Sequence, residues 1–359
     1  MPEEEVREVV DAEMDLLYDA QRKQMEEARG QNEAGGTLAQ MVQIWQAKPT
    51  QKALVLGCFL MALNQFTGIN TVMYYAASIY NMAGYSNEIS IWLSGYTALA
   101  QFAGVMIGLF LVDRVGRKPL LLTSLGMVTL SLGLLGFSFV SMANNSPVVN
   151  FAPDPQCASD HNWLWGNVAT KNCAKCLDIA GCGFCGSPDG AGYCVPIGED
   201  GRPTGECSTF QSLDNYGVDF DPWTTDTCAV EGGGTLSVVA MVLYLLSFGI
   251  GMSGLPWTLT SEIYPQKTRA LMTAVSTGVN WAGNVLVSAS FLSIASPAVL
   301  GPNGAFWLYA LIGLNGFLWL SFNLPETKGL TLEQIESLFS KQSTTSQNDA
   351  PKSYKAIAA

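Results

Sequence analysis

The sequence predicts an all-α membrane protein, a six-span helical bundle with a small disulfide-rich extracellular insert. Three observations predict this fold class. First, only 13% of the 359 residues are charged, compared with about 25% in soluble domains, and the apolar residues gather in long segments. Second, the basic residues fall on alternate connecting segments. Third, eight of the nine cysteines lie in one long loop.

Six apolar segments are each long enough to cross a hydrocarbon core about 30 Å thick, which requires roughly 20 helical residues. They cover residues 53–83, 89–112, 119–143, 235–261, 270–294 and 304–324. The amino-terminal residues are acidic and include no apolar signal-peptide segment, so we expect them to remain in the cytosol. The expected domains are cytosolic linker helices at 1–48, spans one to three at 49–143, the insert at 144–234, spans four to six at 235–325 and a cytosolic tail at 326–359.

The distribution of positive charge sets the expected orientation. All but three of the 18 lysines and arginines lie before the first span, after the second, after the fourth or after the sixth. The exceptions are Lys171, Lys175 and Arg202, all in the loop that holds the cysteines. Because cytosolic loops are rich in lysine and arginine, both termini are expected in the cytosol and the cysteine loop outside.

The cysteines of this loop are expected to form disulfides, because an even number lies in an oxidising compartment. Their pairing stays open. Two CxxC pairs within the set would also suit zinc, but the position outside the cytosol favours disulfides. Cys58, inside the first span, is expected to pack as a small apolar side chain. The eight loop cysteines are Cys157, Cys173, Cys176, Cys182, Cys185, Cys194, Cys207 and Cys228.

The first span carries an unusual density of hydrogen-bonding side chains in the stretch FTGINTVMYY, residues 66–75. Thr67, Asn70 and Tyr74 share one face of an ideal helix, whereas Gln65 lies off that face. Gly68 would loosen the helix and bring the two groups together. Polar groups in hydrocarbon either line a cavity or hydrogen-bond neighbouring helices, and this density favours a cavity.

Three other spans carry matching chemistry. Span four reads SFGIGMSGLPWTLTSEIYP, in which three glycines and Pro256 predict a broken helix. Trp257 follows the break and is expected to stack on a ligand, the alternative being a tryptophan at the membrane interface. Asn280 and Asn284 share a face of span five, and Gln101 lies in span two. Amides both donate and accept, which suits a ligand ringed with hydroxyls.

The cytosolic ends of the spans carry opposite charges, at DRVGRKP and SEIYPQKTR. An ion-pair cluster there would bias two conformations. The alternative is topogenic charge in solvated loops. The residues of this expected cytosolic gate are Asp113, Arg114, Arg117, Glu262 and Arg269.

An enzyme is the poorer interpretation. The chain has one histidine, His161, and no Ser/His/Asp set, no HExxH and no phosphate-binding glycine loop. We therefore expect no cofactor and no metal. A net charge of −12 without a basic patch also argues against a nucleic-acid partner.

Five motifs together resemble the sugar porter family of the major facilitator superfamily. They are NQFTGIN at 64–70, DRVGRK at 113–118, PWTLTSE at 256–262, NWAGN at 280–284 and PETKG at 325–329. TGINTVMYY, SEIYP and ASFLS are most similar to the inositol transporter branch of that family. CAKCLDIAGCGFC resembles the PSI-like (plexin–semaphorin–integrin type) module that some of that branch carry.

The resemblance implies the second, carboxyl-terminal half of a twelve-span fold that moves a polyol or hexose, with myo-inositol favoured, by proton-coupled alternating access. The family's proton-coupling acid belongs to the first half. Asn64 stands where glutamine is usual and has a shorter reach, and Gln101 stands where asparagine is common. By motif position, the residues that would contact the polyol are Gln65, Asn70, Tyr74, Gln101, Trp257, Asn280 and Asn284.

The expected partners are a polyol or sugar, the lipid bilayer, and an amino-terminal six-span half or a second protomer. The protein is expected in the plasma membrane or an endomembrane. Two alternatives stay open: a membrane-anchored extracellular binding module, and a truncated gene model that is inactive alone.

Overall fold

The computed structural model describes Arg22 and residues 47–151, 157, 159–162, 166–169, 172–177, 179, 181–186, 191–198, 223–224, 234–296 and 299–341. The expected linker helices before residue 47 (Arg22 apart), the tail from residue 342, and Cys207 and Cys228 lie outside the described residues.

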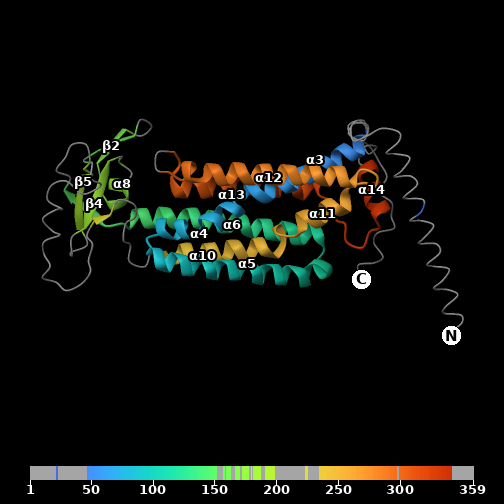
Figure 1. Cartoon of the computed structure of the whole chain (residues 1–359), viewed down its shortest axis with the longest axis horizontal. Coiled ribbons are helices and arrows are strands. Elements are labelled where there is room, and N and C mark those ends of the chain that lie inside the picture. The colour runs from blue at the N-terminus through green and yellow to red at the C-terminus, as the bar shows by residue number, and fades with distance from the viewer. Residues whose placement is uncertain are drawn as a thin grey trace. The chain divides into compact units, whose positions relative to one another are not determined.

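Long helices make up most of the described chain (Figure 1). They are α3 Lys48–Phe66, α4 Ile69–Met82, α5 Asn87–Val115, α6 Arg117–Asn144, α10 Gly234–Ser247, the π-helical turn η2 Phe248–Met252, α11 Leu255–Ile263, α12 Arg269–Ile294, α13 Gly301–Asn323 and α14 Leu332–Lys341.

Five helical stretches of the described chain are long and apolar enough to cross a membrane. They are Lys48–Met82, Asn87–Val115, Arg117–Asn144, Gly234–Ile263 and Gly301–Asn323. The expected fifth span corresponds to α12, whose 26 residues reach about 39 Å at 1.5 Å per residue. Its polar side chains keep it below the hydropathy of the other five.

Leu56–Thr260 and Ser276–Leu330 form one compact unit, and Ser261–Val275 belongs to a second. Within the first unit, α6 packs against both α13 and α10, while α5 packs against α10 and η2 (Figure 1). Gly104 and Gly108 of α5 allow a very close approach, because a Cβ on either would lie 2.2 Å from the carbonyl oxygen of Leu246 or Ile250. Such spacing of small residues is a common way for membrane helices to pack.

The first span breaks where the sequence predicted it. Gly68 separates α3 from α4 with a φ of 84°, a backbone conformation in which a residue with a Cβ is strained. A Cβ there would also lie 2.8 Å from the ring of Tyr309. The Thr67 carbonyl that the break releases accepts a hydrogen bond from the Tyr244 hydroxyl at 2.9 Å, so this buried carbonyl is not left unpaired.

The fourth span breaks as well, through η2 and the turn that precedes α11. Ser124 of α6 satisfies two backbone groups of this segment. Its Oγ donates to the Ser247 carbonyl at 2.7 Å and accepts from the Met252 N–H at 3.0 Å. Side chains from neighbouring helices therefore supply the hydrogen bonds that a regular helix would make internally.

The insert contains β-structure, so the expectation of an all-α chain was wrong there. Its four-stranded sheet has the order β1-β5-β4-β6, in which β1 pairs parallel with β5 and the other pairs are antiparallel, and β2 and β3 form a hairpin. These short strands are rich in glycine and cysteine, which hide the alternation of apolar and polar side chains. The sequence pattern therefore did not indicate the strands. The elements are β1 Val148–Phe151, β2 Ser159–Asn162, β3 Gly166–Ala169, α8 Cys173–Leu177, β4 Cys182–Gly186, β5 Ala191–Pro196 and β6 Trp223–Thr224.

Cysteines form much of the core of the insert. Two disulfides join Cys157 to Cys182 and Cys176 to Cys194, and they pack with Phe184 in one buried cluster. Cys173 and Cys185 are also disulfide-bonded. The sulfurs of Cys157, Cys182 and Cys194 lie within 4.8 Å of one another, but all three are engaged in disulfides and cannot act as thiolate ligands.

Thiol labelling of intact cells tests this chemistry and the expected side of the membrane together. A membrane-impermeant maleimide should leave the described insert cysteines unmodified until a reductant is added, and should then label them. Cys58, which is unpaired and lies in a helix long enough to span the membrane, serves as the internal control and should stay unlabelled in both states. Labelling of any described insert cysteine before reduction would contradict the disulfides.

Candidate functional site

Four amide side chains meet where α3, α4 and α12 come together. The Gln65 Nε2 donates to the Asn280 Oδ1 at 3.1 Å and to the Asn64 Oδ1 at 3.2 Å. The Asn70 Nδ2 donates to the Gln65 Oε1 at 2.6 Å. These four residues are called the amide cluster below. The break at Gly68 brings Gln65 and Asn70 together, as the sequence predicted.

Backbone carbonyls anchor the amide cluster on two sides. The Asn280 Nδ2 donates to the Met61 carbonyl at 3.1 Å and to the Asn64 Oδ1 at 3.2 Å. The Asn64 Nδ2 donates to the Met252 carbonyl at 2.6 Å. Asn64 therefore links the cluster to η2, a role that the sequence did not reveal, since its shorter reach was the only property inferred for it.

The amide cluster has a closed interior and an open edge. Asn64, Gln65 and Asn280 are at most 5% exposed, and both N–H bonds of Gln65 are occupied. Asn70 is half-buried, and among the described residues its amide makes a single hydrogen bond. The interior amides thus act as interhelical hydrogen-bond partners, while Asn70 keeps one N–H and its carbonyl for another partner.

A second polar group lies between α4 and α12. Asn284, 8% exposed, accepts from the Ser288 Oγ at 3.5 Å, and the Tyr75 hydroxyl donates to the Ser288 carbonyl at 3.2 Å. Tyr74, one residue earlier, is 60% exposed. Neither Asn284 nor Tyr74 is hydrogen-bonded to the amide cluster within the described part of the chain.

Gln101 and Trp257 flank η2 rather than joining the cluster. The Gln101 Oε1 is buried and accepts no hydrogen bond from any described residue. A Cβ on Gly249 of η2 would lie 2.5 Å from the Gln101 carbonyl, so this part of α5 lies against the turn. Trp257 is 42% exposed at the start of α11. A buried acceptor without a donor is costly, by about 1–3 kcal/mol, and marks Gln101 as a place where a ligand hydroxyl would be stabilised.

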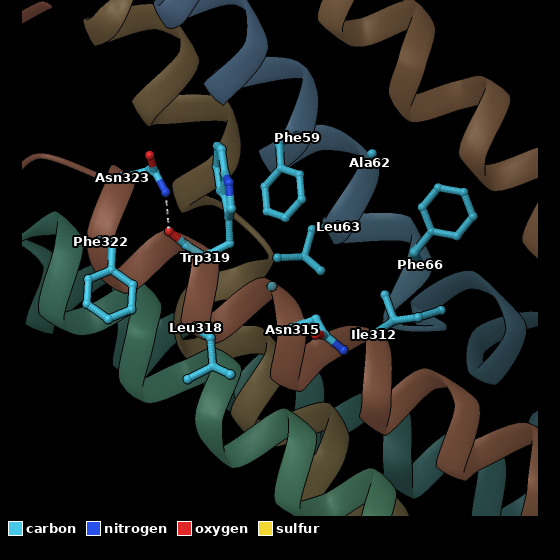
Figure 2. A pocket seen from close by; sticks show the side chains of 11 residues that line it. Phe59, Ala62, Leu63, Phe66, Ile312, Asn315, Leu318, Trp319, Phe322 and Asn323 are labelled. Carbon is cyan, nitrogen blue, oxygen red and sulfur yellow. Dashed lines mark hydrogen bonds between the residues drawn. The ribbon is translucent and has the colours of Figure 1, made fainter.

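A groove of about 580 Å³ lies between α3 and α13, and none of the four amides of the cluster lines it. Figure 2 shows Phe59 and Leu63 of α3 facing Trp319 of α13, and the rings of Phe59 and Trp319 are 4.2 Å apart at their centroids. The side chain of Asn323 donates to the Trp319 carbonyl, within its own helix. This apolar groove suits hydrocarbon rather than a polyol.

At the end of α5, Asp113 and Arg117 form an ion pair at 3.5 Å, and the aspartate is 82% exposed, so the pair contributes little. Arg114 is exposed, and its carbonyl accepts from the Lys328 Nζ at 2.7 Å. Glu262 and Arg269 belong to the other compact unit, where the Arg269 Nε donates to the Tyr264 carbonyl at 3.1 Å.

Glu326 of the PETKG motif accepts several backbone hydrogen bonds at this end, a role that the sequence pattern did not reveal. Its carboxylate accepts from the backbone N–H groups of Arg117 and Lys118, each at 3.1 Å. These N–H groups open α6, where a helix leaves its first donors unpaired and favours an anion. The carboxylate also accepts from the N–H groups of Thr327 and Lys328. The PETKG motif was the one feature of the sequence that could have drawn attention to Glu326.

Comparisons with known proteins show what the chain is similar to. The sequence profile of the family described as "Sugar (and other) transporter" matches residues 3–152 and 216–339, leaving out much of the insert. The proton myo-inositol cotransporter of Homo sapiens is 34% identical over 340 residues, which cover 92% of this chain and 51% of the human protein. Hmit-1.1 of Caenorhabditis elegans, also a proton myo-inositol cotransporter, is 35% identical over 309 residues, covering 82% and 50%.

The chain spans about half the length of the curated relatives that it matches. Among solved structures, that of the major facilitator proton:xylose symporter XylE bound to 6-bromo-6-deoxy-D-glucose superposes with a TM-score of 0.51 and 20% identity. The superposition covers 80% of this chain and 42% of that chain. The likeness shows a shared fold of packed membrane helices.

Proposed function

Because this chain belongs to the sugar transporter family, we propose that it forms the carboxyl-terminal half of a proton-coupled transporter that moves a polyol, myo-inositol above hexoses, across a membrane. The family consists of transporters rather than enzymes, and the chain is an integral multi-pass membrane protein. The observation that carries the proposal is the buried amide cluster, with its open edge at Asn70.

The chemistry of the site suits a ring of hydroxyl groups. Asn70 offers one N–H and a carbonyl, and Gln101 offers an acceptor that no described residue uses. A hydroxyl both donates and accepts, so it can satisfy either amide. Trp257 supplies an exposed ring for the apolar face of the polyol. Gln65, Tyr74, Asn280 and Asn284 complete the proposed contacts.

Two halves are needed for the proposed alternating access, because a transporter of this kind moves its halves about a site between them. The relatives that match are about twice the length of the chain that they match. The partner half is a second six-span segment or a second protomer, and the proton-coupling acid would reside there. In this proposal α12 is a span like the other five, which makes six.

The proposed orientation in the membrane follows from the distribution of charge and from the cysteine chemistry. Cytosolic termini follow from the lysines and arginines, of which all but three lie on one side. The insert would then be an extracytoplasmic PSI-like module in an oxidising compartment, held by its disulfides. The membrane would be the plasma membrane or an endomembrane.

Ligand binding to the purified protein in lipid nanodiscs tests the proposed function. We expect saturable binding of myo-inositol, competed by other polyols and more weakly by hexoses. A cationic solute such as lysine should not compete, because no acidic side chain lies deep in a span. Uptake by the protein assembled with its second half should increase with an inward proton gradient. Absence of saturable binding of any polyol or hexose to the protein assembled with its second half would sink the proposal.

The cytosolic charges are proposed to act as a gate. Asp113, Arg114 and Arg117 would face Glu262 and Arg269 in one of the two conformations and separate in the other. The variant Arg117→Glu should slow conformational cycling in the assembled transporter while leaving polyol affinity within about twofold. Glu88→Lys is the matched control, since it reverses an exposed charge in the first turn of α5, at the opposite end of that helix, and should leave cycling unchanged. Weaker polyol binding with a normal cycling rate would exclude the gate.

A further inference from the structure

Asn64 uses nearly all of its hydrogen-bonding capacity inside the protein. Its Oδ1 accepts from the Gln65 Nε2 and from the Asn280 Nδ2, each at 3.2 Å. Its Nδ2 donates to the Met252 carbonyl at 2.6 Å. The side chain is 5% exposed. Both acceptor positions of the amide are thus occupied, and its reach toward a ligand is blocked by its own neighbours.

We propose that Asn64 is a positioning residue, which orients Gln65 and Asn280 for the polyol and ties them to η2 without touching the polyol itself. This inference rests on the proposed polyol site. It gives Asn64 a role at the position where the family usually has glutamine. The backbone of η2 is then one of the two anchors of the amide cluster, the other being the Met61 carbonyl.

The orientations of the amides are linked by hydrogen bonds that run from the Met252 carbonyl through Asn64 and Gln65 to Asn70. The Met252 carbonyl can only accept, so Asn64 must turn its Nδ2 toward η2 and its Oδ1 toward the cluster. That oxygen accepts from Gln65 and from Asn280. The Met61 carbonyl also accepts from the Asn280 Nδ2, and the bonds to Asn64 and Met61 together fix which way the amides face. The Gln65 Oε1 is then directed at Asn70, whose Nδ2 donates to it at 2.6 Å. Linked hydrogen bonds of this kind also strengthen one another.

Ser124 provides a matched control at the same turn. It is fully buried and contacts η2 from α6, through the Ser247 carbonyl and the Met252 N–H. Among the described residues it makes no hydrogen bond to the amide cluster. Ser124→Ala therefore removes two hydrogen bonds from the segment that Asn64 also holds, and it leaves the amides in place.

The experiment compares Asn64→Ala and Ser124→Ala with the unmodified protein in nanodiscs, with asparagine and glutamine labelled with ¹⁵N. In Asn64→Ala, the side-chain N–H groups of Gln65 and Asn280 should exchange with deuterium at least about tenfold faster, and the dissociation constant for myo-inositol should rise by at least about fivefold. Ser124→Ala should lower the melting temperature while both quantities stay within about twofold.

Unchanged exchange in Asn64→Ala, or equally fast exchange in Ser124→Ala, would overturn the positioning role. If Asn64→Ala binds myo-inositol as tightly as the unmodified protein does, the positioning role is also overturned, while the proposed function is unaffected. If the unmodified protein binds no polyol while the exchange pattern is as expected, the proposed function fails and the positioning of the cluster is upheld. Should Asn64→Ala not fold, Asn64→Ser gives the same test, because a serine hydroxyl bonds to its own helix and cannot reach the two amides.

Discussion

Replacing Asn70 by alanine should weaken myo-inositol binding about 5- to 150-fold. Asn70 is the half-buried edge of the amide cluster and has hydrogen-bonding groups left for a ligand. A substrate hydroxyl that loses its partner in a buried site costs about 1–3 kcal/mol, and about 1.4 kcal/mol corresponds to a tenfold change in affinity. The change also deprives the buried Gln65 Oε1 of its donor.

The measurement must separate a ligand contact from interhelical packing. Melting temperature and affinity are therefore determined on the same purified sample. The matched control is Asn315→Ala, which removes an exposed amide of α13 that donates to the Leu311 carbonyl of its own helix at 2.7 Å. This control should leave affinity unchanged. A loss of several degrees in Asn70→Ala beside unchanged affinity would mean that FTGINTVMYY serves packing alone.

Replacing Gly108 by alanine should destabilise the helical bundle by about 2–3 kcal/mol, the upper range for overpacking. The added Cβ would lie 2.2 Å from the Ile250 carbonyl oxygen and within 3.2 Å of two further backbone atoms of that residue. Backbone cannot rotate away as a side chain can, so α5 must separate from η2. Because Gln101 lies on the same helix, beside Gly249, its buried acceptor should move as well.

Gly95 offers a control on the same helix, since a Cβ there would meet nothing within 4 Å. Gly95→Ala should keep or slightly raise the melting temperature, because alanine is favoured over glycine in a helix by about 1 kcal/mol. Thermal unfolding of both variants in detergent, followed by size-exclusion chromatography, gives the comparison. Equal melting temperatures would show that the close approach at Gly108 is not required.

Much of the fold was predictable because its signals are local. Hydropathy located five of the expected spans to within a few residues, and α12 matches the remaining expected segment, the fifth, in position. The glycines and the proline of the fourth span indicated its break, and Gly68 indicated that of the first. Five short motifs indicated the sugar transporter family, which the comparisons confirm.

The candidate site was only partly predictable. Helix periodicity placed Asn70 on a polar face but left Gln65 off it, and only the left-handed turn at Gly68 brings the two within 2.6 Å. The sequence could not show that Asn64 bonds to Met252, which lies 188 positions away. It also gave Glu326 no role, because the N–H groups that this carboxylate accepts from open a helix 209 positions earlier.

The sequence by itself determined the membrane class, the positions of the helices and their breaks, the family, and the kind of side chain available to a ligand. Each of these properties depends on residues that are close together in the sequence, through hydropathy, backbone freedom or a short motif. The tertiary structure decided which amides meet, which cysteines pair and which strands form in the insert. Those outcomes depend on the packing of distant segments, and hydrogen bonds in a water-poor interior form only where packing brings a donor to an acceptor.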